Sequence, residues 1–246
     1  MAATQKTVLI TGSTRGIGLA FAEYYVNAGW KVIGTARANS NTEKVRTTSH
    51  SFQSETDRHH GHRDEASMLE AARQLEGIPI DLLINNAGMG IYTTFETASK
   101  DAIMKTLQVN ALGPFLATRA LVSNLKLAAK DDQPAVVLQI SSILGSVTSN
   151  NEDYAQLFRG QYGYTTSKAA LNMITRSLAM DLRESNIAVV AVNPGYVATD
   201  MSNHQGVIKA DDAVAAMDSI VSKLSLDDSG KFFNADPAIP ASELSW

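Results

Sequence analysis

Five short apolar runs, separated by segments of helical period, constrain the fold more than any other feature of this chain. Each run is rich in Val, Ile and Leu and almost continuous in apolar character, which is typical of strands buried on both faces of a parallel sheet. The runs occupy 7–11, 31–35, 80–85, 135–141 and 187–193. The segments between them are long enough for crossover helices. The alternation predicts an α/β fold with a doubly wound parallel sheet.

Helix signals fit this interpretation. Segment 16–28 ends at Gly29, segment 65–76 ends at Gly77, and segment 211–224 starts with two aspartates suited to a helix N-terminus. The chain contains no internal repeat and no Pro-, Gly- or Ser-rich linker. Its 246 residues suit one hydrophobic core, so residues 1–246 are expected to form a single domain.

One segment departs from the alternation of apolar runs and helical segments. Segment 37–63 is polar throughout, at the place where a third buried strand is expected. Either the sheet lacks that strand or it tolerates a poorly apolar one. His59, His60 and His62 lie in this segment, but three histidines in a polar loop are more often solvated than metal-bound. No metal site is predicted.

Composition excludes several classes of protein. The chain has no cysteine, and therefore no disulfide framework or thiolate metal site. Its net charge of -4 argues against a nucleic-acid partner. No apolar run approaches the roughly 20 residues of a membrane helix, and the N-terminal apolar segment is too short for a secretory signal. A cytoplasmic protein without a membrane partner is expected.

The first strand runs directly into a glycine-rich turn, "TGSTRGIG", at residues 11–18. Gly12, Gly16 and Gly18 allow a tight turn and a close approach of a pyrophosphate to a helix N-terminus. The spacing is G-x-x-x-G-x-G rather than the standard G-x-G-x-x-G. A purely structural turn is the alternative, but the strand–turn–helix context favours a Rossmann-like dinucleotide site.

Two arginines indicate which dinucleotide binds. NAD sites usually place an acidic residue about 20 positions beyond the turn, on the adenine ribose. This chain has Arg37 in that region and no carboxylate before Glu43, and Arg15 lies inside the turn. Two guanidiniums suit a 2′-phosphate, which predicts NADP(H) as the cofactor. The alternative is that Arg37 is only a solvated residue after a strand.

The stretch "YGYTTSK", residues 162–168, contains a candidate proton-transfer pair. In a helix Tyr164 and Lys168 share a face, whereas Tyr162 points elsewhere. A phenol with a pKa near ~10 is a poor acid at neutral pH, and an adjacent ammonium is expected to lower that pKa. By itself, a tyrosine and a lysine at this spacing are weak evidence for a catalytic site. Polar residues also follow the predicted strands at 135–141, 80–85 and 187–193, and such strand ends should line one crevice.

Together these motifs resemble the short-chain dehydrogenase/reductase family. The chain has, in order, T-G-x-x-x-G-x-G at 11–18, N-N-A-G at 85–88, Asn110, Ser142, Y-x-x-x-K at 164–168 and Pro194-Gly195. Within that family it is most similar to the Sniffer-like and C-factor-like carbonyl reductases. The resemblance implies a Rossmann-like fold and an oxidoreductase.

The resemblance also implies roles for individual residues. Tyr164 would be the general acid/base, Lys168 would lower its pKa, Ser142 would polarise the substrate, and Asn110 would kink its helix and hold a water; Ser141 would complete the strand. These four residues, Asn110, Ser142, Tyr164 and Lys168, are the expected catalytic set. The expected cofactor contacts are Gly12, Thr14, Arg15, Gly16, Ile17, Gly18, Arg37, Asn86, Ala87, Gly88, Tyr164, Lys168, Pro194, Gly195, Val197 and Thr199.

The expected activity is therefore NADPH-dependent reduction of an aldehyde or ketone to an alcohol. The implied substrates are small or lipid-derived carbonyl compounds. The resemblance further implies a homodimer or homotetramer. The alternative, motivated by the irregular segment 37–63, is an NADP-binding regulatory protein with little or no turnover.

Overall fold

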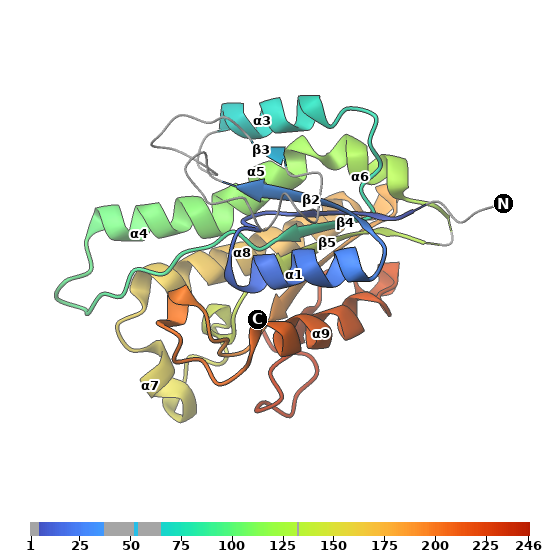
Figure 1. Cartoon of the computed structure of the whole chain (residues 1–246). Helices are drawn as coiled ribbons and strands as arrows, with labels where there is room; N and C mark the ends of the chain where they lie inside the picture. The colour runs from blue at the N-terminus through green and yellow to red at the C-terminus, as the bar shows by residue number, and fades with distance from the viewer. Residues whose placement is uncertain (1–4, 37–51, 54–64, 132) are drawn as a thin grey trace.

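The computed structural model describes residues 5–36, 52–53, 65–131 and 133–246 and shows a parallel sheet flanked by helices (Figure 1). Seven strands pair in the order β3-β2-β1-β4-β5-β6-β7 within the described part of the chain, every pair parallel. The predicted doubly wound α/β fold is confirmed. The strands are β1 (Thr7–Ile10), β2 (Lys31–Ala36), β3 (Phe52–Gln53), β4 (Leu82–Asn85), β5 (Ala135–Ile140), β6 (Ile187–Asn193) and β7 (Phe232–Asn234).

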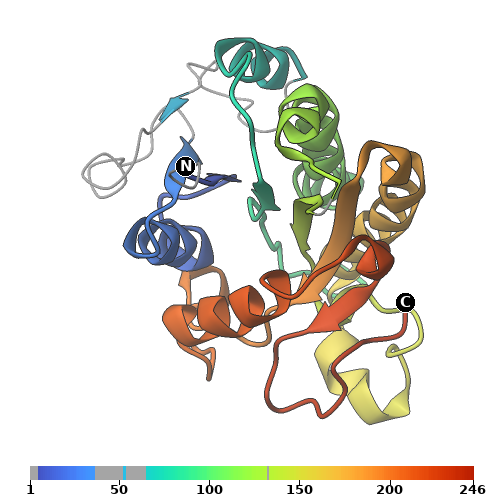
Figure 2. The ribbon, with the colours of Figure 1, turned by 90° about the vertical axis from the view of Figure 1, so that its right-hand side faces the viewer.

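Helices cover both faces of the sheet (Figure 2). One face carries α1 and α9, which pack against each other, and the other carries α3, α5, α6 and α8. Within β1, Val8 and Ile10 join the core on the first face, whereas Leu9 joins the core on the second. The strand is continuously apolar because both of its faces are buried. The helices are α1 (Gly16–Asn27), α3 (Glu65–Gln74), α4 (Lys100–Leu107), α5 (Gly113–Ala120), α6 (Val122–Ala128), α7 (Ala155–Phe158), α8 (Tyr162–Asp181) and α9 (Ala210–Val221).

The third strand exists but is short. Only Phe52 and Gln53 pair with β2, in register with Thr35 and Ala36. Of the two alternatives that the polar segment left open, the sheet therefore has the strand rather than lacking it. Arg37 and the three histidines of that segment lie outside the described residues. Within the described ranges, no group of three or more His, Asp or Glu side chains could hold a metal ion.

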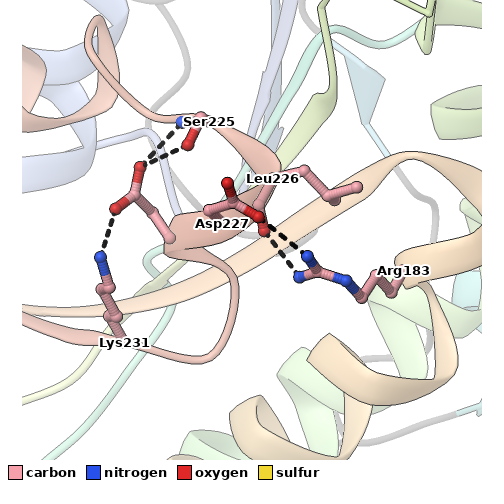
Figure 3. A network of polar contacts seen from close by, with 6 residues as sticks. Arg183, Ser225, Leu226, Asp227 and Lys231 are labelled. Atoms are coloured by element: carbon pink, nitrogen blue, oxygen red, sulfur yellow. Dashed lines mark hydrogen bonds and ion pairs between the residues drawn. The ribbon is translucent and has the colours of Figure 1, made fainter.

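The last strand, β7, is anchored by an ion-pair network on the turn that precedes it (Figure 3). Arg183, just after α8, donates hydrogen bonds to the Leu226 carbonyl at 3.0 Å and to the Asp227 carboxylate at 2.9 Å. Beyond the strand, the Trp246 ring stacks on Phe232 with ring centroids 5.3 Å apart. The C-terminal tryptophan thus packs on its own chain.

All the strands of a parallel sheet end at the same edge, and here the segments with unusual polar residues follow β1, β4, β5 and β6 at that edge. In Figure 1 the arrows of β2 and β4 point to the left, toward the side of the molecule where α4 begins. In the described ranges no helix combines the length and apolar character needed to cross a membrane.

Candidate active site

The turn between β1 and α1 has a backbone that requires glycine. Gly12 and Gly16 have φ values of 68° and 54°, in the left-handed region that other residues rarely adopt. At Gly18 a Cβ would collide with the carbonyl oxygen of Gly12 and the side-chain amide of Asn86. The first turn of α1 holds no acidic residue and is not capped by the side chain of Arg15. Its N–H groups and helix dipole therefore favour an anion at this end.

Replacing Gly18 with Ala is expected to lower the affinity for a nicotinamide dinucleotide by about 10- to 100-fold. The added methyl must displace the backbone of the turn, and overpacking of this kind costs about 1–3 kcal/mol. Isothermal titration with NADPH measures the effect. Gly29→Ala, at the other end of α1, is the control for a general loss of stability: its φ of 79° also disfavours alanine, but its added atom meets open space. Equal affinities for Gly18→Ala and the parent protein would contradict the prediction.

Hydrogen bonds join the N-N-A-G segment after β4 to the glycine turn. The Asn86 amide donates to the carbonyl oxygens of Thr11 and Gly12, at 2.9 and 3.2 Å. The Thr11 hydroxyl accepts the backbone N–H groups of Asn86 and Ala87, both at 3.0 Å. Gly88 lies beside Asn110, whose Oδ1 would be 3.4 Å from an added Cβ. The Asn86 side chain shapes the turn, and its predicted contact with the adenosine stays a prediction.

The loop after β6 closes over the same turn. Pro194 and Val197 are buried, and Gly195 has a φ of 81°. The Thr199 methyl group lies within 3.3 Å of the Cβ position of Gly16. The loop therefore lies against the glycine turn. Thr14 and Ile17 are half-buried at this turn.

Arg15 bridges the two segments. Its Nη1 lies 3.1 Å from Oδ2 of Asp200, and Nε2 of His204 lies 3.1 Å from the other carboxylate oxygen. All three side chains are exposed, so this pairing contributes little to stability. Asp200 is not among the site residues predicted from the sequence. Its ion pair with Arg15 is seen only in the folded structure.

Tyr164 and Lys168 lie one turn apart on α8, as their spacing predicts. The Lys168 ammonium is 5.6 Å from the centroid of the Tyr164 ring and donates to the Ile140 carbonyl at 2.7 Å. Tyr162 is 45 % exposed, and its ring lies 6.1 Å from that of Phe95. The structure thus pairs Lys168 with Tyr164 and directs Tyr162 away.

The expected lowering of the Tyr164 pKa is wrong. Burial raises the pKa of Tyr164 to about 12, and a hydrogen bond with Ser142 acts in the opposite sense. Burial also lowers the pKa of Lys168 to about 8. The direction differs because burial removes both groups from water, and desolvation disfavours their charged forms.

Ser142 begins the turn that follows β5 and faces Tyr164. Its hydroxyl hydrogen-bonds with Tyr164 and accepts the N–H of Leu144 at 3.2 Å. Ser141 is buried, and its N–H donates to Val192 in β6 at 2.8 Å, extending the strand pairing by one residue. Of the two serines, Ser142 is the one placed at Tyr164.

Asn110 lies in a π-helical turn, Gln108–Leu112, between α4 and α5. Its amide binds both backbone groups of Met89, at 2.9 and 2.8 Å, and donates to the Ser167 hydroxyl at 3.0 Å. The helix is distorted where the resemblance implies a kink, and π turns often occur at functional sites. Asn110 thus ties the segment after β4 to the residue preceding Lys168.

Exposed apolar side chains lie on the segments next to Tyr164, where the mouth of this site would be. An added Cβ at Gly90 would lie 3.8 Å from Tyr164 and 4.0 Å from Met201. Tyr92 and Phe95 are largely exposed next to Gly90 in sequence. The Thr93 N–H donates to the Gly160 carbonyl at 3.3 Å, which joins this segment to the one between α7 and α8. Tyr92, Phe95 and Met201 thus give this mouth exposed apolar side chains.

A doubly wound sheet with a glycine-rich turn after its first strand, and with a hydroxyl, a phenol and an ammonium at its carboxyl edge, defines a Rossmann-type oxidoreductase. Residues 6–207 match the model of the family described as short chain dehydrogenase. The chain belongs to that family of oxidoreductases.

Similarity to known proteins supports this family membership. C-signal of Myxococcus xanthus is 35% identical over 169 residues, which cover 68% of this chain and 93% of that protein. The NADPH-bound carbonyl reductase from chicken fatty liver is 29% identical with a TM-score of 0.85, covering 99% of this chain and 100% of that one. Carbonyl reductase Sniffer of D. melanogaster is 27% identical with a TM-score of 0.84 and the same coverage.

Proposed function

We propose that this protein, acting as one domain over residues 1–246, is an NADPH-dependent carbonyl reductase that converts an aldehyde or ketone to an alcohol. The observation that carries the proposal is the proximity of Ser142, Tyr164 and Lys168 to one another, at the end of the parallel sheet where the glycine turn also lies. Two similar solved structures are named carbonyl reductases, one of them with NADPH bound.

The residues at the glycine turn fit a dinucleotide. At Gly18 a Cβ would collide with the Gly12 carbonyl oxygen, so only glycine permits the close packing of α1 on the turn that dinucleotide sites of this kind use. The N-terminus of α1 has no carboxylate that would repel an anion. Gly12 to Gly18, Thr199 and Lys168 would hold the cofactor, and NADPH when bound supplies the hydride.

The remaining steps belong to side chains of this chain. Ser142 would orient the carbonyl oxygen with its hydroxyl. Tyr164, protonated at neutral pH because its pKa is about 12, would donate its proton to that oxygen. Lys168, with a pKa of about 8, is largely an ammonium at neutral pH and would stabilise the phenolate that forms. The apolar mouth favours carbonyl compounds with a hydrocarbon or aromatic substituent.

A titration with NADPH and separately NADH, followed by fluorescence, tests the proposal together with a panel of aliphatic and aromatic carbonyls. Tighter binding of NADPH and its oxidation in the presence of a carbonyl are expected. Binding of NADPH without turnover across the panel would favour the alternative of an NADP-binding regulatory protein. Binding of neither nucleotide would overturn both.

The cofactor preference is expected to depend on Arg15 and Arg37. Replacing both with Ala should weaken NADPH binding by about 10- to 100-fold and change NADH binding by less than about threefold, because only NADPH carries the 2′-phosphate. Arg183→Ala is a matched control, since Arg183 is engaged far from the glycine turn at Leu226. An unchanged ratio of the two dissociation constants in the double variant would contradict the prediction.

A further inference from the structure

The turn that presents Ser142 is held on both sides by a single side chain. Asn172 lies on α8 and is 3% exposed. Its Oδ1 accepts the Ser141 hydroxyl at 2.6 Å, and its Nδ2 donates to the Gly145 carbonyl at 3.1 Å. One amide therefore binds the residue before Ser142 and the third residue after it. Both hydrogen bonds are buried, where breaking them leaves unpaired polar groups.

Asn172 also belongs to the helix face that carries the proton-transfer pair. Tyr164, Lys168 and Asn172 follow one another at intervals of four residues, which places them in one row along α8. The turn touches this row directly. A Cβ at Gly145 would lie 2.7 to 2.9 Å from the backbone and Cβ of Lys168, so only glycine permits the contact.

Two other side-chain hydrogen bonds of the turn lead to parts of the chain other than α8. The Ile143 N–H donates to Oδ1 of Asn193 at 3.1 Å, and Asn193 belongs to β6. The Ser146 hydroxyl donates to the Ser245 carbonyl at 2.7 Å. These contacts fix the turn to the sheet and to the C-terminal segment. Among the hydrogen bonds between the backbone of the turn and side chains in the described ranges, the bond from Asn172 leads to α8, the helix of Tyr164.

We propose that Asn172 is a positioning residue that sets the place of Ser142 relative to Tyr164 and Lys168 through its two hydrogen bonds to Ser141 and Gly145. The role rests on the proposed reductase function, because Ser142 must meet the carbonyl oxygen that Tyr164 protonates. A catalytic group displaced by about 1 Å loses about 100-fold in rate. Asn172 itself touches neither substrate nor cofactor in this role.

The test compares three variants of the full-length protein. Asn172→Leu removes both hydrogen bonds and keeps the number and branching of the side-chain heavy atoms, and Ser141→Ala removes one of the bonds. Thr175→Val is the matched control: Thr175 is equally buried on α8, and its hydroxyl donates only within the helix, to Leu171 at 2.8 Å. The measurements are kcat and KM for a carbonyl, the dissociation constant for NADPH, and hydrogen–deuterium exchange of the peptide 141–149.

Asn172→Leu is expected to lower kcat by about 10- to 100-fold, with NADPH affinity within about twofold and faster exchange in 141–149. Ser141→Ala should fall between it and the parent protein, and Thr175→Val should match the parent. Equal kcat for Asn172→Leu and the parent, or equal losses in Asn172→Leu and Thr175→Val, would overturn the proposal.

The outcomes separate this inference from the proposed function. If the parent protein reduces no carbonyl, the reductase proposal fails, and the exchange of 141–149 alone decides whether Asn172 holds the turn. If Asn172→Leu does not fold, Ser141→Ala carries the test, and its unchanged kcat and exchange would overturn the inference.

Discussion

The Tyr164→Phe variant is expected to lose carbonyl reduction by about 1000-fold or more while binding NADPH with an affinity within about twofold of the parent protein. Phenylalanine keeps the ring that lies beside Lys168 but lacks the proton that the carbonyl oxygen must receive, and general acid catalysis contributes about 10²- to 10⁴-fold. Single-turnover measurements with preloaded NADPH separate the loss in chemistry from any change in binding.

Tyr162→Phe is the control for this substitution. Both tyrosines lie in the first turn of α8, but Tyr162 packs beside Phe95 and away from Lys168. Its variant should retain at least half of the turnover. An active Tyr164→Phe protein, or equal losses in both variants, would remove Tyr164 from the proposed mechanism.

Lys168→Met is expected to lower turnover by about 100-fold or more. The variant keeps an unbranched, slightly shorter side chain but lacks the positive charge that stabilises a phenolate at Tyr164, and loss of one such electrostatic contact costs about 10²- to 10³-fold. The parent enzyme should also lose kcat/KM as the pH rises through about 8, where Lys168 becomes neutral. Rate profiles between pH 6 and about 9.5 test both expectations; a pH-independent parent rate would contradict them.

Protein stability provides a second measurement on the same variant. The pKa of Lys168 falls from 10.5 in the unfolded chain to about 8 in the fold. Between these values the unfolded chain binds more protons, so the free energy of unfolding contributed by Lys168 rises with pH. The total gain is about 3 kcal/mol at 1.36 kcal/mol per pKa unit. In urea unfolding, the difference in the free energy of unfolding between the parent and Lys168→Met should change with pH between about 8 and 10.5. Below about pH 8 that difference should stay constant.

Much of the fold follows from short-range pattern. The five apolar runs correspond to β1, β2, β4, β5 and β6 because a strand buried on both faces must be continuously apolar. The two-residue β3 could not be found in this way. It pairs through the backbone with β2, and backbone pairing imposes no apolar period on so short a segment.

The pairing of Tyr164 with Lys168 could also be predicted, since a spacing of four residues places two side chains on one helix face. The same spacing leads from Lys168 to Asn172, a signal that was present in the sequence but had no meaning without the partner turn. Ser141 and Gly145 reach Asn172 from the end of another strand. Such long-range hydrogen bonds depend on how α8 packs against the sheet.

The sequence by itself determined the doubly wound fold, the glycine-rich turn and the identity of the residues gathered at the carboxyl edge of the sheet, because periodicity and spacing act over a few residues. Only the tertiary structure decided the protonation of the site and the partners of its polar groups. Burial raises the pKa of Tyr164, which the sequence predicts to be lowered, and Asp200 forms an ion pair with Arg15. Both effects arise between segments far apart in the chain, where desolvation and charge depend on what packing brings together.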